Sequence, residues 1–333
     1  MTELNDKLPL DDSGDVARDF DGSFSDPARQ QKADISPFLV LMICIAMFIA
    51  GNIAGSALML GLAYLNGLDF QVVLKNLSAD TPIGTRNFMR AVMFINHFFS
   101  FILPSLITGW VVYKTQILKG FRLTKFPLLP VVGLGIVWLM VSIPLVQYAY
   151  QVNKMIPLPD WMMDMENSTG NILEAIISKE SFYEVIINVL LIAVIPAIGE
   201  ELMFRGLIQQ QIGRILKNEH LTVWISAAFF SAIHMQFQGF FARMILGALL
   251  GYLLIWSRSL WVPMIIHFLN NGIQVLALYV MDIKPSDIDK IGESDKMHWT
   301  MGLASLMLVI MIGKFISEKY YLPEENLPRD NFN

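Results

Sequence analysis

The chain has 333 residues, of which 54% are hydrophobic and 16% are charged, and its formal net charge is −5. A typical soluble domain carries roughly 25% charged residues, so this composition excludes an ordinary soluble globular protein and indicates an integral membrane protein. The net charge says little about partners, because nine acids and only four bases lie in residues 1–35. The single cysteine, Cys44, excludes an intrachain disulfide and a cysteine-based metal cluster.

The two ends of the chain are expected to be polar tails. Residues 1–35 hold no apolar stretch that could serve as a secretory signal, and we expect them to be disordered. Residues 321–333 are expected to form a short polar C-terminal tail. Between them, residues 36–320 show no boundary that would divide two folded domains, so we expect one transmembrane helical domain.

Eight stretches are candidates for membrane-spanning helices, because a span needs about 20 mostly apolar residues. They cover residues 37–65, 88–113, 126–148, 182 to about 200, 221–235, 240–256, 260–281 and 299–316. The fifth stretch is short for a span. The sequence therefore predicts an all-α fold, a polytopic transmembrane bundle of about eight helices.

The segment between the third and fourth stretches is too polar to span a membrane. Residues 158–166 and 172–177 are amphipathic, which favours helical pieces that lie in the membrane interface. A plain solvent-exposed loop is the alternative interpretation.

The distribution of Lys and Arg in short loops predicts the orientation, because cytoplasmic loops carry an excess of these residues. Residues 114–125 hold four bases, whereas residues 66–87 and 150–181 hold two each. With eight spans, both termini lie on the same side as residues 114–125, which we expect to be cytoplasmic. Three lysines within residues 284–296 fall on the other side and weaken the bias.

Two adjacent acids and an arginine follow the fourth apolar stretch, as Glu200, Glu201 and Arg205. A charge inside a membrane span costs about 2.5 kcal/mol or more, so such groups persist when they pair or do chemistry. Glu201 and Arg205 stand at i,i+4 and are expected to pair, whereas Glu200 points elsewhere, since each residue turns a helix by about 100°. One carboxylate is then neutralised and the other is available as a base. The wet end of a helix is the alternative interpretation.

Histidines interrupt three of the apolar stretches. His234 ends the fifth, while His267 and Asn271 stand at i,i+4 in the seventh and project from one face. An imidazole and an amide there could orient a water molecule or donate to an oxyanion, and an imidazole could bind a metal. Interhelical hydrogen bonding is the alternative for each histidine alone. We interpret His97, in the second stretch, as a satisfied core histidine.

These segments together resemble the CPBP intramembrane protease family, which includes the CAAX prenyl endopeptidases and the bacterial Abi proteins. Glu-Glu-x-x-x-Arg at 200–205 matches its first motif, Phe-x-x-x-His at 230–234 its second, and His-x-x-x-Asn at 267–271 its third. Any one motif is weak, but the ordered set is specific. The resemblance covers roughly residues 180–280.

The resemblance implies a helical bundle with an intramembrane polar cavity and an endopeptidase that hydrolyses peptide bonds at the membrane. It implies that Glu200 activates water with the help of His234, and that His267 and Asn271 stabilise the oxyanion. Glu201 and Arg205 would hold the helix of the first motif in place.

Several alternatives stay open at this point. The family is often described as metalloproteases, so a zinc ion held by His234, His267 and Glu200 is the competing mechanism, since catalytic zinc takes three protein ligands and a water. A non-catalytic scaffold or immunity protein, or a transporter, are the competing functions. The expected partners are the lipid bilayer and a peptide or protein substrate that is lipidated or membrane-bound, without nucleic acid. The expected location is a bacterial cytoplasmic (inner) membrane.

Overall fold

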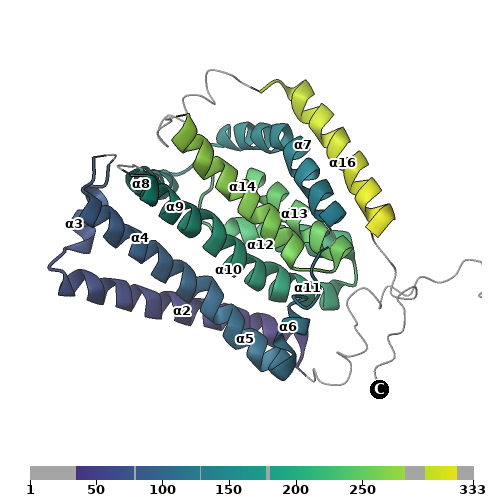
Figure 1. The fold of residues 1–333 in the computed structure, drawn as a ribbon, viewed down its shortest axis with the longest axis horizontal. Coiled ribbons are helices and arrows are strands. Elements are labelled where there is room, and N and C mark those ends of the chain that lie inside the picture. Colours follow the sequence, from purple (N-terminus) through teal and green to yellow (C-terminus); the bar gives the residue numbers. More distant parts are fainter. Residues whose placement is uncertain (1–34, 79, 128, 178–180, 282–296, 321–333) are drawn as a thin grey trace, which may run out of the picture.

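The computed structural model describes residues 35–78, 80–127, 129–177, 181–281 and 297–320. Within these ranges every regular element is helical (Figure 1). The predicted tails lie outside the described residues except for Ile35. The all-α prediction is therefore confirmed.

Twelve of the described elements are α-helices of eight or more residues. In chain order they are α2 (Pro37–Leu65), α4 (Ile83–His97), α5 (Leu103–Tyr113), α7 (Leu129–Lys154), α8 (Asp160–Ile177), α9 (Phe182–Val189), α10 (Ile195–Met203), α11 (Gln209–Leu216), α12 (Glu219–Ala232), α13 (Phe240–Ser257), α14 (Trp261–Val280) and α16 (Trp299–Tyr320). The shorter ones are α3 (Phe70–Lys75), the 3-10 turn η3 (Lys114–Gln116), α6 (Ile117–Gly120) and three π-helical segments, η2 (Phe98–Ile102), η4 (Leu190–Val194) and η5 (Phe204–Ile208). In Figure 1, α2 and α4–α5 lie along one edge and α7 and α16 along the other, with α10, α12 and α14 between them.

Seven described helices or helix runs are long and apolar enough to cross a membrane. The predicted fifth span corresponds to α12, which has 14 residues. At 1.5 Å per residue it is about 21 Å long, which is less than the roughly 30 Å of a bilayer core. The prediction of about eight spans therefore holds apart from this short helix.

Two of the seven runs are composite helices. The run Ile83–Gly120 contains η2, and the run Phe182–Leu216 contains η4 and η5. Pro104 is the second residue of α5, which follows η2, and Pro196 is the second residue of α10, which follows η4. Proline removes one helical hydrogen bond, and a wider π turn is one way in which a helix accommodates it. The run that contains Pro196 thus stays one continuous helix with π-helical segments inside it.

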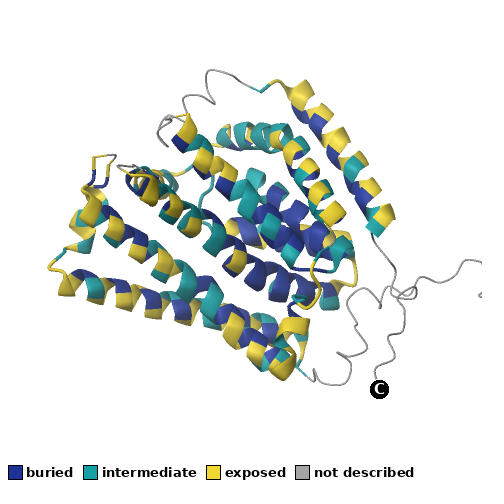
Figure 2. Cartoon of the chain, in the orientation of Figure 1, coloured by how far each residue is buried: buried dark blue, intermediate teal, exposed yellow. Residues whose placement is uncertain are grey.

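The outer faces of the bundle are apolar. Figure 2 shows many exposed residues along α2 and α16, and they include large hydrophobics such as Ile49, Ile53 and Met311. Continuous apolar surface of this kind requires an apolar environment, which the lipid of a membrane supplies. Together with the seven spans, it identifies the chain as an integral membrane protein.

The predicted interfacial segment is one helix, α8, rather than two pieces. Its last turn, Ala175–Ile177, is buried, while much of its length is not. Its position in the membrane interface stays a prediction.

Two glycines on α13 allow α12 to pack closely against it. A Cβ atom on Gly247 would lie 3.0 Å from Cδ1 of Phe230, and one on Gly251 would lie 3.1 Å from Cγ1 of Val223. Such separations are tight for a larger residue, and small residues let neighbouring helices approach closely. This contact fixes the helix that precedes His234.

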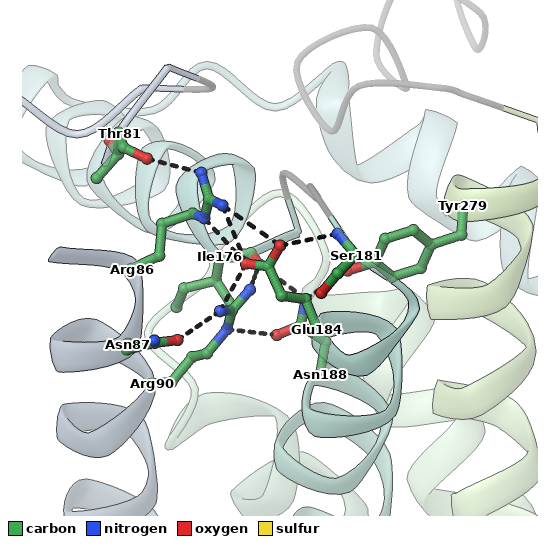
Figure 3. A network of polar contacts seen from close by, with 9 residues as sticks. All are labelled: Thr81, Arg86, Asn87, Arg90, Ile176, Ser181, Glu184, Asn188 and Tyr279. Carbon is green, nitrogen blue, oxygen red and sulfur yellow. Dashed lines mark hydrogen bonds and ion pairs between the residues drawn. The ribbon is translucent and has the colours of Figure 1, made fainter. Parts of the chain in front are cut away.

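A buried ionic network joins α4 to α9 near one end of the bundle (Figure 3). The Nε atom of Arg86 donates to Oε1 of Glu184 at 3.1 Å, and Nη1 of Arg90 donates to the same oxygen at 2.9 Å. All three side chains are almost fully buried. Because unpaired buried charges are costly, the network stabilises the packing of these two helices.

The same network reaches α8 and α14 through Asn188 of α9. Its Oδ1 accepts from Nε of Arg90 at 2.9 Å, and its Nδ2 donates to the carbonyl oxygen of Ile176 in α8 at 2.7 Å. Nδ2 also contacts the hydroxyl of Tyr279 in α14. Four helices are therefore held together here, and sequence reasoning did not identify this cluster.

Candidate active site

The buried carboxylate of Glu200 lies among three histidines. Its Oε1 is 3.7 Å from Nε2 of His97, and its Oε2 is 3.6 Å from Nε2 of His234 and 3.8 Å from Nε2 of His267. The four residues come from α10, α4, the end of α12 and α14. The separations exceed direct hydrogen bonds, so the imidazoles surround the carboxylate at distances that small shifts or a water molecule can bridge.

Access to this group is uneven. The side chain of His234 is 23% exposed, compared with 7% for Glu200 and 3% for His267. A substrate or a water molecule therefore reaches the carboxylate most directly from the side of His234.

Glu201 makes the contact that its place on the helix predicts. Its Oε1 accepts from Nη1 of Arg205 at 2.8 Å, which is the predicted i,i+4 pair. The same oxygen lies 2.8 Å from Nδ1 of His267. Sequence reasoning did not anticipate this second contact, which joins two motifs through one carboxylate.

Arg205 connects the first motif to its neighbours. Its Nη2 donates to the carbonyl oxygen of Gly247 in α13 at 2.8 Å, and its guanidinium lies 4.6 Å from the ring centroid of Phe230. A cation over an aromatic face gains electrostatic attraction, more so where water is excluded. The arginine thus holds α12 and α13 in register with the helix that carries Glu200 and Glu201.

The imidazole of His234 is oriented by its own helix. Its Nδ1 lies 2.7 Å from the carbonyl oxygen of Phe230, one turn earlier. A carbonyl oxygen only accepts hydrogen bonds, so Nδ1 carries the proton and the lone pair of Nε2 is directed toward Glu200 when the ring is neutral. Met235, the next residue, has a φ of 52°, a left-handed conformation that is uncommon outside glycine. The chain therefore turns sharply out of the helix directly after His234.

Asn271 lies one turn beyond His267 on α14, as predicted. Its Nδ2 donates to the carbonyl oxygen of Ile192 in η4 at 3.2 Å, and its Oδ1 accepts from Nδ2 of Asn270 at 3.0 Å. Asn271 therefore contacts the helix run that carries Glu200. The contact is with the backbone at Ile192, about two turns before Glu200.

The environment of His97 differs from the one that the sequence predicted. Its ring stacks on Phe101, with centroids 4.7 Å apart, which agrees with a core histidine. Its Nε2, however, is buried without a hydrogen-bond partner among the described residues and faces Glu200. The interpretation of a satisfied core histidine was therefore wrong. The only signal in the sequence was a polar pair, Asn96 and His97, inside an apolar stretch.

A zinc ion held by His234, His267 and Glu200 stays an alternative prediction. Among the described residues, no group of three or more His, Cys, Asp or Glu side chains is placed to hold a metal ion. Zinc ligands lie about 2.0–2.2 Å from the metal around a shared point. The nitrogens of His234 and His267 lie 3.6 and 3.8 Å from Oε2 of Glu200, and the mechanism below uses these side chains without a metal.

Comparisons with known proteins agree with the position of the site. Residues 182–273 match the family model described as type II CAAX prenyl endopeptidase Rce1-like, and this range contains all three motifs. The chain is 30% identical over 142 residues to an uncharacterised Bacillus subtilis protein, YpbD. That match covers 41% of this chain and 66% of the relative. No solved structure matches. The predicted resemblance is thus confirmed for residues 182–273, which match the Rce1-like model.

Proposed function

We propose that this protein is a membrane-embedded endopeptidase in which Glu200 and His234 activate the water that attacks a peptide bond. The observation that carries the proposal is the placement of Nε2 of His234 at 3.6 Å from Oε2 of a buried carboxylate. The family to which residues 182–273 belong supports peptidase chemistry.

The protonation of the two groups favours a water molecule between them. Oε2 of ionised Glu200 and the unprotonated Nε2 of His234 both accept hydrogen bonds, and they face each other. Water donates twice, so a water molecule joins the two acceptors once the side chains move slightly apart. As the water oxygen attacks the peptide carbonyl carbon, Glu200 takes its proton and later transfers it to the leaving amine nitrogen.

The tetrahedral intermediate carries a negative oxygen that needs donors. Nδ1 of His267 is directed at Glu201, so Nε2 of His267 donates only when the ring carries both protons. The amide nitrogen of Asn271 has two hydrogens, and its contact with Ile192 uses one of them. These two residues are our proposed oxyanion donors, in line with the usual role of such groups.

The pair of Glu201 and Arg205 acts through other residues. Glu201 orients His267, and Arg205 fixes the helix of the first motif against Gly247. The peptide and the water touch neither of them in this proposal, so both are positioning residues. A zinc-dependent form of the reaction is the less favoured version, because the side chains would have to rearrange to hold the ion.

The proposed setting is a bacterial cytoplasmic membrane with both termini in the cytoplasm, supported by the basic segment 114–125 and by the bacterial relative. The proposed substrate is a lipidated or membrane-bound peptide, because Glu200, His97 and His267 lie on helices that are long and apolar enough to cross a membrane.

The test is cleavage of quenched lipidated peptides by the purified protein in liposomes, with products identified by mass spectrometry. We expect cleavage by the parent protein that His234→Ala abolishes. A parent protein that is folded and inserted but cleaves no peptide of a broad lipidated library would favour a scaffold, an immunity protein or a transporter.

A further inference from the structure

We propose that His97 is a positioning residue for the general base: its Nε2–H binds Oε1 of Glu200 and leaves Oε2 as the oxygen that takes the proton. This inference rests on the function proposed above. It assigns a role to a residue outside the three motifs and outside the matched range 182–273.

The two carboxylate oxygens of Glu200 have different neighbours. His234 and His267 both approach Oε2, at 3.6 and 3.8 Å, whereas His97 alone among the histidines approaches Oε1, at 3.7 Å. Nε2 of His97 is buried and has no other hydrogen-bond partner among the described residues. A buried polar atom without a partner costs about 1–3 kcal/mol, so a small movement that joins Nε2 to Oε1 is favourable.

The surroundings of His97 hold its ring against the helix of Glu200. The ring stacks on Phe101 with an interplanar angle of 29°. On the opposite helix, a Cβ atom on Gly199 would lie 3.3 Å from Cδ2 of His97 and 3.1 Å from Cβ of Phe101. The missing side chain at the residue before Glu200 is therefore what allows the imidazole to approach the carboxylate.

A π-helical segment also marks this position. η2 begins at Phe98, directly after His97, and α10 is bracketed by η4 and η5. π segments inside α-helices are rare and occur frequently at functional sites, because the extra residue changes the direction of the side chains around them. Both helices that meet at the contact between His97 and Glu200 carry this irregularity.

The consequence for the reaction is a fixed orientation of the base. A carboxylate that is held through one oxygen presents the other in a constant direction, here toward His234 and His267. A misplacement of about 1 Å can reduce a rate by about 10²-fold, so an unheld Glu200 would be a poorer base.

Two substitutions separate this role from simple packing. His97→Phe keeps the aromatic stack but removes the donor, whereas His97→Gln removes the stack but keeps an N–H donor. We expect His97→Phe to lower kcat by about 10²-fold, with KM changed by less than about twofold, as for a misplaced catalytic group. We expect His97→Gln to retain a clearly higher kcat than His97→Phe.

The matched control is His220→Phe, at a histidine on α12 whose Nδ1 contacts the hydroxyl of Tyr252. We expect its kcat to equal that of the parent protein. If His97→Phe is as active as His97→Gln or more so, the role of His97 is packing and the inference is overturned.

A second measurement does not depend on activity. In nitrogen-15 histidine spectra of the protein in detergent, the His97 signals are those that disappear in His97→Phe. We expect Glu200→Gln to move the Nε2 signal of His97 and to leave those of His220 unchanged. An unmoved His97 signal would overturn the inference even if the protein is a protease. If the His97 signal moves but the protein cleaves no peptide, the contact between His97 and Glu200 stands and the proposed function is rejected.

Discussion

One oxygen of Glu201 lies 2.8 Å from Nδ1 of His267, a residue from a different motif on a different helix. The same oxygen pairs with Arg205, so this one oxygen joins two protein groups. Glu200, its neighbour in the sequence, has a carboxylate surrounded by three imidazole nitrogens. The adjacent acids therefore have separate tasks, and the predictions below test that division.

Glu201→Ala should lose both stability and activity. Removal of one partner from a buried ion pair leaves the other charge uncompensated and costs about 3–5 kcal/mol. Arg205 is 1% exposed and would be that charge. The midpoint of thermal unfolding in detergent and the cleavage rate per folded molecule measure the two losses.

The double variant Glu201→Leu with Arg205→Met provides the control. Replacement of a buried pair by apolar residues of similar volume is often neutral for stability, so the unfolding midpoint should recover. Activity should not recover, because His267 has lost the acceptor for its Nδ1–H. A double variant with parental activity would show that the contact between Glu201 and His267 is not needed.

Asn271→Ala should reduce kcat by about 10²–10³-fold, the usual loss when one oxyanion donor is removed. Asn270 is its natural control, because it is adjacent on α14 and donates to Oδ1 of Asn271. Asn270→Ala should have a much smaller effect on kcat. Equal losses in the two variants would indicate that Asn271 acts only by packing α14 against Ile192.

Glu184→Ala should destabilise the protein without changing its chemistry. The variant leaves Arg86 and Arg90 with fewer partners in a buried network, and a loss of about 3–5 kcal/mol is expected from a broken buried pair. The matched control is Glu318→Ala, where the glutamate is 67% exposed and lies 3.7 Å from Lys314. An exposed pair at i,i+4 contributes only about 0.3–0.5 kcal/mol. Chemical unfolding of both variants in the same detergent decides the point; equal stabilities would contradict the assigned importance of the network.

A metal chelator should leave the cleavage rate unchanged, because no described group of side chains is arranged to hold a metal ion. The measurement is the cleavage rate before and after incubation with a strong zinc chelator, with metal content determined on the same sample. Activity that is lost to the chelator and restored by zinc would contradict this account. It would instead assign His234, His267 and Glu200 as ligands.

The sequence predicts the parts of the site that depend on helical periodicity. The separation of Glu200 from the pair of Glu201 and Arg205 follows from the turn of about 100° per residue, and the structure shows it. The positions of the long apolar helices follow from composition, because a bilayer core requires a certain length of apolar residues.

Other features depend on contacts between helices, which one sequence does not determine. His97 precedes Glu200 by more than a hundred residues, and nothing in its neighbourhood indicates which helix it faces. The contact between Glu201 and His267 also joins two different helices, so the sequence alone does not predict it. The π segments also escape prediction, because a single widened turn leaves the apolar pattern of a helix almost unchanged.

The measurement that tests the central claim most directly is the rate of peptide cleavage by Glu200→Gln compared with the parent protein. Glutamine is nearly isosteric with the glutamate but cannot accept the proton from water. We expect the variant to be folded and inserted, to bind the peptide, and to cleave it at least about 10²-fold more slowly, as for loss of a general base. Full activity of Glu200→Gln in the same liposomes would contradict the account, because the water would then be activated by another group.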